Sequence, residues 1–452
     1  MIMQIITVDE TKCIGCNACV RVCPVHANIT RLKPGATDEF VTVIDSDACI
    51  NCGECVKNCR HGARGYRDHI EEFKECFENK KEMVLIVAPA IRTSYPDGTW
   101  KVLLAWLKRH ANCRIYDVGY GADICSYMHN KYLQENPNKK IVTQPCPAVV
   151  NYIQKYKPEL IPYLSPVLSP VGCLATWLRK YQKETAPMFM LSPCIAKTSE
   201  AGREGLYDYN VTFRALDKFV NKKKIDWDAP ADFKFDAVEG SIGRMYPMPS
   251  GLKETMLMLN PNLVIRNTEG IHELYPSLDR YAETPDERKP DILDVLNCRH
   301  GCNRGTALPE DDTTLLEVEQ IMHKITEKSI RETSGGFLGI GKFKRFKEFD
   351  KTLKLEDFLT TYKDESAHRP KLSPEEYEEV FKHMHKYDFV SQNINCGACG
   401  YRHCRDMAYA IYYKLNVREN CVYYLKQSMK DQYAELKAKY EEAIQQLKAQ
   451  NV

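Results

Sequence analysis

Residues 13–24 read Cys-Ile-Gly-Cys-Asn-Ala-Cys-Val-Arg-Val-Cys-Pro, and residues 49–59 repeat the spacing as Cys-Ile-Asn-Cys-Gly-Glu-Cys-Val-Lys-Asn-Cys. In iron-sulfur modules with this spacing, three closely spaced thiolates hold one 4Fe-4S cluster and the fourth reaches to the other cluster. Crossing the fourth ligands therefore predicts two clusters. The ligands are Cys13, Cys16, Cys19 and Cys59 for one cluster, and Cys49, Cys52, Cys55 and Cys23 for the other. Four thiolates also suit zinc, but zinc knots rarely use this spacing twice.

The composition describes a folded chain without a dominant charge. It has 452 residues, 44% of them hydrophobic, and 63 Lys and Arg stand against 61 Asp and Glu. A net charge of +2 creates no global field toward nucleic acid or anionic lipid. The longest apolar stretch, Val84 to Ile91, is far shorter than the ~20 residues of a membrane-spanning helix. We expect a soluble, cytoplasmic protein with neither nucleic acid nor membrane as a partner.

A third cysteine knot lies near the C-terminus, where residues 396–404 read Cys-Gly-Ala-Cys-Gly-Tyr-Arg-His-Cys. Its glycines allow the backbone to wrap a cluster, and a following helix can return a fourth thiolate. We expect a third 4Fe-4S cluster on Cys396, Cys399, Cys404 and Cys421. His403 is a rival for the fourth position, but most such clusters have only thiolate ligands.

Eight of the 20 cysteines remain, and four of these have informative neighbours. Cys146 lies in Thr-Gln-Pro-Cys-Pro at 143–147, and Cys194 lies in Ser-Pro-Cys-Ile-Ala-Lys-Thr-Ser-Glu at 192–200. Cys298 and Cys302 lie in Asp-Val-Leu-Asn-Cys-Arg-His-Gly-Cys at 294–302. Spread over about 160 residues, these cysteines meet only if the fold brings them together. The other four are expected to be buried structural thiols: Cys76, Cys113, Cys125 and Cys173.

These three segments resemble the signature motifs of the FeFe hydrogenase catalytic domain, in the same order. Residues 87–92, 117–123, 155–160 and 164–170 also resemble segments of that family. The resemblance implies an H-cluster, in which a 4Fe-4S cube is joined through one cysteine to a two-iron unit with CO, cyanide and a dithiolate. By motif, Cys146, Cys194 and Cys298 hold the cube and Cys302 bridges to the two-iron unit.

Other residues of the same motifs would serve the two-iron unit. Lys197, three residues after Cys194, would give a cyanide ligand a charge-assisted hydrogen bond and offset its lost solvation. Four further residues are expected to form the pocket wall around the cluster, where small side chains and amides tune its potential. These are Pro89, Ala90, Ser169 and Pro170.

Several positions depart from the family pattern, and they concern proton supply. The cysteine that relays protons in the family is Pro145 here, and proline carries no proton. Two acidic relay positions correspond to His129 and Tyr132, whereas Ser165 matches a relay serine. At the remaining departures, this chain has Ser192 and Leu296 where the family has methionines, Asp294 where it has glutamate and His300 where it has glycine. Because loss of a general acid or base costs a factor of ~10² to 10⁴ in rate, we expect slow turnover. His129 or His300 would offer a different route for protons.

The sequence predicts a multidomain α/β and α+β protein. A ferredoxin-like module is expected at residues 1–78, an H-cluster domain of two α/β lobes at 79–372, a small helical 4Fe-4S domain at 373–423 and a terminal amphipathic helix at 424–452. Apolar periodicity predicts strands at 83–87 and 140–143, helices at 68–79, 99–111, 123–134 and 311–328, and a glycine-rich break at 335–341. The basic, aromatic segment 342–347 is expected to be an amphipathic surface element.

The terminal helix has an apolar stripe at spacings of four and three. Its members are Leu425, Met429, Tyr433, Leu436, Tyr440, Ile444 and Leu447. Such a heptad-like stripe favours a two-helix coiled coil, and we expect a homodimer. The alternative is a helix docked on its own domain.

Three functions compete. The chain resembles the sensory branch of the FeFe hydrogenases, which would convert H2 to protons and electrons slowly and signal to a separate protein. The second is a bidirectional hydrogenase that exchanges electrons with a ferredoxin-like partner. The third is a non-enzymatic iron-sulfur assembly scaffold of the same fold. The eight N-terminal cluster cysteines and Lys197 argue against the third, and Pro145 argues against the second.

Overall fold

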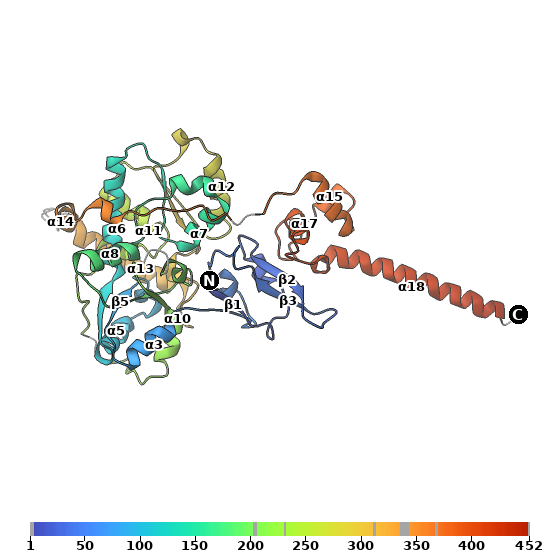
Figure 1. Cartoon of the computed structure of the whole chain (residues 1–452), viewed down its shortest axis with the longest axis horizontal. Helices are drawn as coiled ribbons and strands as arrows, with labels where there is room; N and C mark the ends of the chain where they lie inside the picture. The colour runs from blue at the N-terminus through green and yellow to red at the C-terminus, as the bar shows by residue number, and fades with distance from the viewer. Residues whose placement is uncertain are drawn as a thin grey trace. The chain divides into compact units, whose positions relative to one another are not determined.

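The computed structural model describes residues 4–201, 206–229, 232–310, 313–334, 343–366 and 369–450. The chain divides into two compact units (Figure 1). Unit 1 comprises residues 1–6, 50–53 and 66–367, and unit 2 comprises 7–49, 54–65 and 368–452. The N-terminal cysteine runs and the C-terminal module therefore share unit 2, apart from residues 50–53. The four-part division of the chain stays a prediction.

Unit 1 contains a parallel four-stranded sheet with the strand order β6-β5-β8-β9. The strands are β5 (Met83–Val87), β6 (Cys113–Asp117), β8 (Met188–Ser192) and β9 (Tyr209–Thr212). Strands β5 and β8 are buried along their whole length, as expected for continuous apolar runs in a parallel sheet covered on both faces. The helices that pack in the core of this sheet are α3 (Ile70–Glu78), α5 (Thr99–His110) and α10 (Phe213–Val220).

A second parallel sheet of unit 1 has the order β10-β11-β7. Its strands are β7 (Ile141–Val142), β10 (Ile265–Glu269) and β11 (Ile292–Leu296). The core around it includes side chains of α6 (Val118–Glu135), α8 (Pro170–Thr176), α11 (Gly251–Leu259) and α14 (Lys344–Thr352). The remaining α-helices of unit 1 are α4 (Ile91–Ser94), α7 (Pro147–Tyr156), α9 (Lys197–Ala201), α12 (Leu274–Glu283) and α13 (Leu315–Ser334). The two lobes of the predicted fold are thus present, and the fold class is confirmed.

Unit 2 combines two short sheets, several small helices and one long helix. The strands are β1 (Ile6–Val8) with β4 (Arg64–Tyr66), and β2 (Asn28–Leu32) with β3 (Phe40–Ile44). The helices are α1 (Ala18–Arg21), α2 (Glu54–Lys57), α15 (Pro374–His383), α16 (Phe389–Gln392), α17 (Cys404–Tyr412) and α18 (Val422–Gln450). Val20 packs in the same core as Phe381 and Met407, and Thr30 N–H donates to the Leu415 carbonyl over 2.8 Å.

Most predicted elements are found close to their expected bounds, and the differences have local causes. Helix α6 begins at Val118 rather than 123, because the Asp117 side chain caps it by accepting from Gly119 N–H at 3.0 Å. Helix α13 begins at Leu315, after Thr314 accepts from Glu317 N–H at 3.3 Å. The glycine-rich break at 335–341 lies outside the described residues. In the basic segment, Phe346 is buried in the second core, so α14 is an amphipathic surface helix.

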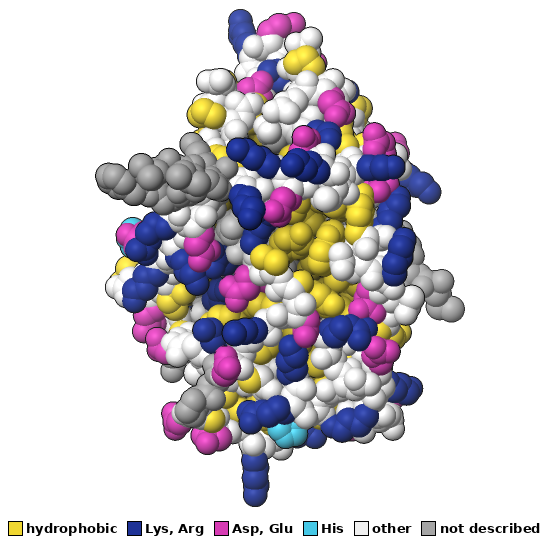
Figure 2. Space-filling model, turned by 90° about the vertical axis from the view of Figure 1, so that its left-hand side faces the viewer, with side chains coloured by type: hydrophobic (Ala, Val, Ile, Leu, Met, Phe, Trp, Pro, Cys, Tyr) yellow, Lys and Arg dark blue, Asp and Glu magenta, His cyan; other side chains and the backbone are white. Residues whose placement is uncertain are grey.

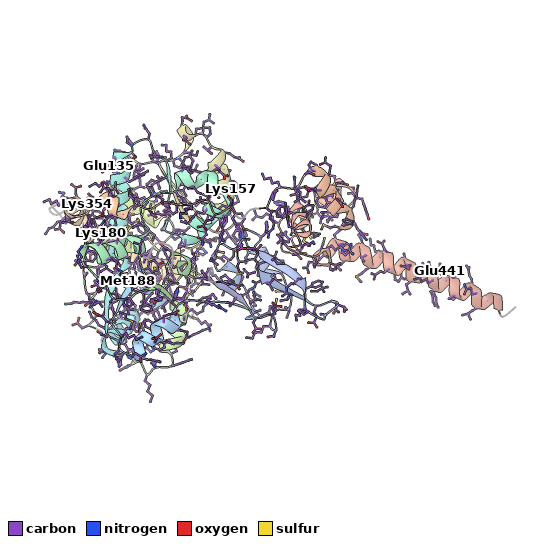
Figure 3. All side chains as sticks on the ribbon, in the orientation of Figure 1. Glu135, Lys157, Lys180, Met188, Lys354 and Glu441 are labelled. Carbon is purple, nitrogen blue, oxygen red and sulfur yellow. The ribbon has the colours of Figure 1, made fainter. Side chains whose placement is uncertain are left out.

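Helix α18 extends away from the core of unit 2. Its side chains project on all sides, as seen around the labelled Glu441 in Figure 3. Six members of the apolar stripe are between 41% and 70% exposed, so within the described residues the stripe is not docked on its own domain. Figure 2 shows Lys and Arg intermixed with Asp and Glu on one face of unit 1. No helix among the described residues is long and apolar enough to cross a membrane.

Candidate metal centres

The four remaining motif cysteines follow the carboxyl ends of parallel strands in both sheets of unit 1. Strand β7 ends four residues before Cys146, β8 ends two residues before Cys194, and β11 ends two residues before Cys298. Open parallel sheets place their ligands at this edge, because the loops that leave it converge there. The sites predicted from separate motifs thus lie at the same edge of the two parallel sheets.

One cavity of about 90 Å³ lies at this edge. All four cysteines line it, together with the side chain of Lys197. The other predicted residues in its wall are Pro89, Ala90 and Pro170, and Pro145 lies there as well. Ser169 does not line this cavity; it faces an adjacent one of about 340 Å³. The structure therefore gathers the predicted donor set, and its apolar wall of proline, alanine and valine suits a buried iron-sulfur group.

Local geometry directs each cysteine into the cavity. Cys146 is the N-cap residue of α7 and is followed by Pro147, whose missing N–H costs nothing at the first helical position. Gly301 has a φ of +69°, and a Cβ there would lie 2.2 Å from the Pro247 carbonyl oxygen. Only glycine fits this close approach, which turns the loop from Cys298 to Cys302 toward the cavity.

The loop that carries Cys194 is held by a buried hydrogen-bond network. Cys194 N–H donates to Ser192 Oγ at 3.3 Å, and Asn210 Nδ2 donates to the Cys194 carbonyl at 3.2 Å. Ser192 Oγ in turn lies 2.7 Å from Asn210 Oδ1, and Asn210 Nδ2 also reaches Thr198 Oγ1 at 3.0 Å. Ser192, which departs from the family pattern, thus helps to fix the position of Cys194.

Burial raises the pKa of two thiols in the cavity, those of Cys194 and Cys302. Burial, together with the neighbouring Cys146 thiol, raises the pKa of Cys194 to about 11 against an opposing effect of Lys197. Burial and the thiols of Cys194 and Cys146 raise the pKa of Cys302 to about 12. The metal-free protein therefore holds these groups as neutral thiols near pH 7. Because metals bind thiolates, cluster insertion would release their protons.

Lys197 begins helix α9, and its position is set by two further side chains. It is only 8% exposed, and its ammonium forms an ion pair with the Glu200 carboxylate. Glu200 also accepts a hydrogen bond from Ser169 Oγ, which itself caps α8 by accepting from Gly172 N–H at 3.3 Å. Glu200 stood in the motif without an assigned role, although its i,i+3 spacing from Lys197 is a signal for an ion pair on a helix.

A chain of buried polar groups begins at Tyr246, which lines the cavity. His129 Nε2 lies 2.8 Å from Ser165 Oγ, and His129 Nδ1 lies 3.5 Å from Cys125 Sγ. Burial acts to lower the pKa of His129, but contact with the Cys125 thiol outweighs burial and raises this pKa. Burial acts to raise the pKa of Cys125, but hydrogen bonds outweigh burial and lower it. Tyr246 interacts with Cys125 and also lines the cavity. His300 is half-buried and is not among the residues that line the cavity.

The first N-terminal cluster set lies entirely within unit 2, in the part of the chain at residues 13–59. Cys19 Sγ accepts from Arg64 Nη2 at 3.1 Å, and Cys13 Sγ accepts from Thr42 N–H at 3.5 Å. Arg64 is only 6% exposed and was not identified from the sequence. In the second set, Cys23, Cys49 and Cys55 belong to unit 2 and Cys52 to unit 1.

The C-terminal cysteines surround a cavity of their own in unit 2. Its lining includes all four predicted ligands, Cys396, Cys399, Cys404 and Cys421. Burial, together with the other three thiols, raises the pKa of Cys399 to about 11. His403 also lines the cavity, so geometry keeps it as a rival ligand. Lys386 lines the same cavity and was not identified from the sequence.

Among the described residues, no three His, Cys, Asp or Glu side chains are grouped closely enough to hold a single metal ion. In a 4Fe-4S cluster each of the four thiolates has its own iron, so its ligands surround a larger volume than those of one ion. Four cysteines line each of the two cavities.

Known family models match three parts of the chain. Residues 81–275 match the model described as iron only hydrogenase large subunit, C-terminal domain. Residues 12–63 match a 4Fe-4S dicluster domain, and residues 392–423 match a model of an Fe-S cluster motif. The first range contains Cys146, Cys194 and Lys197 but ends before Cys298 and Cys302.

Curated relatives include iron hydrogenases and an assembly factor. The chain is 29% identical to the periplasmic Fe hydrogenase large subunit of Nitratidesulfovibrio vulgaris, over 53% of this chain and 62% of the relative. It is 26% identical to iron hydrogenase 1 of Clostridium pasteurianum, over 69% of this chain and 66% of the relative. It is also 34% identical to the cytosolic Fe-S cluster assembly factor NAR1 of Encephalitozoon cuniculi, over 26% of this chain and 32% of the relative. The chain therefore spans less than two thirds of each relative's length.

Among solved structures, the chain resembles an apo FeFe hydrogenase variant from Chlamydomonas reinhardtii. The TM-score is 0.50 at 18% sequence identity, over 67% of this chain and 100% of the other. This similarity supports the fold of unit 1.

Proposed function

We propose that the protein converts H2 reversibly and slowly to protons and electrons. Residues 81–275 match the C-terminal domain of iron-only hydrogenase large subunits, and 4Fe-4S dicluster and Fe-S cluster regions accompany them. The protein would act as a sensor that signals the presence of hydrogen, or the redox state, to another protein. When bound, the two-iron unit would supply the open metal position and the redox couple for H2. The cofactors would be one H-cluster and three accessory 4Fe-4S clusters.

The observation that carries this proposal is the shared cavity of unit 1. Three strand ends from two sheets bring Cys146, Cys194 and Cys298 to it, and Gly301 turns Cys302 toward it. Lys197 is the one cationic side chain among the residues lining this cavity, as the described chain shows it. In the low dielectric of the cavity, its ammonium would donate to an anionic cyanide ligand and offset the loss of solvation.

Slow turnover follows from the wall of the same cavity. Pro145 lies in that wall and has no exchangeable proton. The buried chain from Tyr246, which lines the cavity, through Cys125 to His129 and Ser165 offers a titratable path. We assign the alternative proton route to His129, because it belongs to this hydrogen-bonded chain.

A sensory role is supported by what lies outside the hydrogenase domain. Unit 2 ends in the long helix α18, whose apolar stripe is exposed and suits a second copy of the chain. The helix begins one residue after Cys421, a ligand of the C-terminal cluster. Electrons would come from or go to a ferredoxin-like protein, and a separate cytoplasmic signalling protein would receive the output. A bidirectional hydrogenase would use the same electron path without the signalling step.

A second candidate function is iron-sulfur assembly without hydrogen chemistry. The observation in its favour is the similarity to NAR1 over 123 aligned residues. A protein of this kind would use the cysteine-lined cavities for cubane clusters only, and Lys197 would pair with Glu200 without meeting an anionic iron ligand.

Infrared spectroscopy of the full chain separates these candidates. After cubane reconstitution and loading with the two-iron precursor, we expect CO and cyanide bands together with weak H2 oxidation. Cubane signals without such bands would favour the assembly function. Bands with turnover as fast as that of an efficient hydrogenase would contradict slow catalysis.

The Pro145→Cys variant tests the reason for slow turnover. A thiol at this wall position restores a proton carrier, so H2 oxidation should rise by a factor of about 10² to 10⁴ if proton transfer limits the rate. Pro145→Ser is the matched control, because it removes the proline ring and adds a far weaker acid. Equal rates in wild type and both variants would show that another step limits turnover.

A further inference from the structure

The C-terminal cavity of unit 2 contains a buried charge that no sequence motif explains. Lys386 is 0% exposed and donates its ammonium hydrogen bond to the Ser391 carbonyl. The same ammonium lies 3.5 Å from the sulfur of Cys404 and 4.4 Å from the centre of the Tyr423 ring. Within the described residues no carboxylate forms an ion pair with it. A buried ammonium without a counter-ion is costly, so the cavity calls for an anion.

The end of helix α15 directs this lysine inward. His385 N–H donates to the Lys382 carbonyl at 3.0 Å, and Lys386 N–H donates to the Phe381 carbonyl at 2.9 Å. This pair of hydrogen bonds is a Schellman motif, with His385 in the left-handed region at φ 57°. Glycine is the usual residue there, since a side chain at positive φ is strained. The turn therefore fixes the backbone from which Lys386 enters the cavity.

The same turn contacts the beginning of α18. The Lys386 ammonium lies over Tyr423, the second residue of that helix. His385 Nδ1 lies 3.5 Å from Asp431 Oδ2, and its ring packs edge-on to Tyr424 with centroids 5.1 Å apart. One turn thus contacts both a cluster cysteine and the first three helical turns of α18.

With the proposed function as its premise, namely that this cavity holds a 4Fe-4S cluster, we propose that Lys386 stabilises the reduced cluster and couples its charge to the root of α18. A cluster with four thiolates is anionic, and one electron from a reduced accessory cluster or a redox partner adds a negative charge without making or breaking a bond. The buried ammonium favours that reduced state, because nearby charge and hydrogen bonds to cluster sulfurs set the potential. Its stronger attraction to the cluster weakens its contact with the Tyr423 ring.

The first test measures the potential of the C-terminal cluster in the full, reconstituted chain. An electron paramagnetic resonance titration with dithionite follows it, and a Cys399→Ser variant that lacks this cluster identifies its signal. Lys386→Met should give a more negative midpoint potential for this cluster and leave the other clusters unchanged. Lys382→Met, which removes an exposed lysine of α15, should match wild type. Equal midpoint potentials in Lys386→Met and Lys382→Met would overturn the proposal.

The second test measures the coupling to α18. Hydrogen exchange of the amides at 422–431 should differ between oxidised and reduced wild-type protein. In Tyr423→Leu the redox dependence of exchange should be lost, and the midpoint potential should become less negative, because the ring that competes with the cluster for the ammonium is gone. Exchange that is independent of redox state in wild type would contradict the coupling. If Lys386→Met fails to bind a cluster, Lys386→Arg is measured instead, because it keeps the charge. Its midpoint potential should stay close to that of wild type, and a large negative shift would contradict the role of charge.

These outcomes are distinct from a failure of the hydrogenase proposal. Missing CO and cyanide bands would concern the cavity of unit 1 and would leave the potential of this cluster measurable. A wild-type chain that binds no reducible cluster at 396–421 would refute the role of Lys386 while the infrared result stands.

Discussion

The ammonium of Lys197 is ion-paired with the Glu200 carboxylate, one turn further along helix α9. Ser169, the N-cap residue of α8, donates to the same carboxylate. Glu200 therefore holds Lys197 and is itself held by Ser169. The pair keeps a buried cation in place at the cavity wall before any cofactor arrives. An anionic iron ligand would then meet a donor whose position is already fixed.

Replacing Lys197 should therefore weaken retention of the two-iron unit. In Lys197→Met the charge-assisted hydrogen bond is lost, and the affinity should fall by about tenfold to a hundredfold, in line with about 1.5 to 3 kcal/mol for such a bond. CO and cyanide band intensities per chain, measured during titration with the precursor, check this. Lys180→Met, which removes an exposed lysine that pairs with Asp357, is the matched control. Equal loading in the two variants would contradict the role of Lys197.

His129 should be needed for proton transfer but not for cofactor binding. His129→Gln keeps a side chain that can reach Ser165 Oγ but cannot change its protonation state near neutral pH. We expect H2 oxidation to fall by about 10²-fold, with unchanged infrared bands. His323→Gln, at an exposed position of α13, should behave like wild type. A wild-type rate in His129→Gln would rule out the buried path.

Asp294 should make the metal-free protein less stable as the pH rises. It is buried, and burial raises its pKa to about 6, above the ~3.9 of an unfolded chain. The folded state therefore binds more protons than the unfolded state between these values, so stability falls from about pH 4 to pH 6 and then levels off, at a cost of about 3 kcal/mol.

The Asp294→Asn variant removes this titration and keeps an oxygen for Lys253 N–H, which lies 3.0 Å from the carboxylate. Denaturant unfolding should show the variant to be more stable than wild type at pH 8, with a difference that shrinks toward pH 4. Asp228→Asn, at an exposed position, is the control. A stability difference that does not change with pH would contradict the raised pKa.

The exposed stripe of α18 should control the oligomeric state. Met429, Tyr433, Leu436 and Tyr440 are each 66% to 70% exposed, which is costly for a helix without a partner. Sedimentation of the full chain should give the mass of a dimer, and a chain ending at Tyr423 should give that of a monomer. Leu436→Glu should also dissociate the dimer, whereas Glu435→Gln on the flank should not. An unchanged mass after truncation would exclude this interface.

The sequence was most informative where chemistry needs fixed spacing. The cysteine runs predict three cluster sets, and the buried strand at 83–87 was predicted at its observed bounds because its apolar run is continuous. Pattern alone could not bring Cys146, Cys194 and Cys302 together, because their convergence depends on how the loops of two sheets meet. The resemblance to a family supplied that step.

Residues that act through tertiary packing were missed for a related reason. Lys386 reads as an ordinary surface lysine at the end of a helix, and only the turn at His385 shows that it points inward. The early start of α6 was missed because the capping role of Asp117 depends on a hydrogen bond two residues along. Arg64 likewise gains its role from Cys19, 45 residues away in the chain.

The placement of the cluster cysteines at strand ends of two separate sheets has a mechanical consequence. Once iron is bound, the loops after β7, β8 and β11 are joined through one inorganic group, much as a cross-link joins distant parts of a chain. Binding only to the folded state adds its free energy to folding, so the loaded protein resists unfolding of either lobe alone. Such a cofactor would thus also hold the two lobes of unit 1 together.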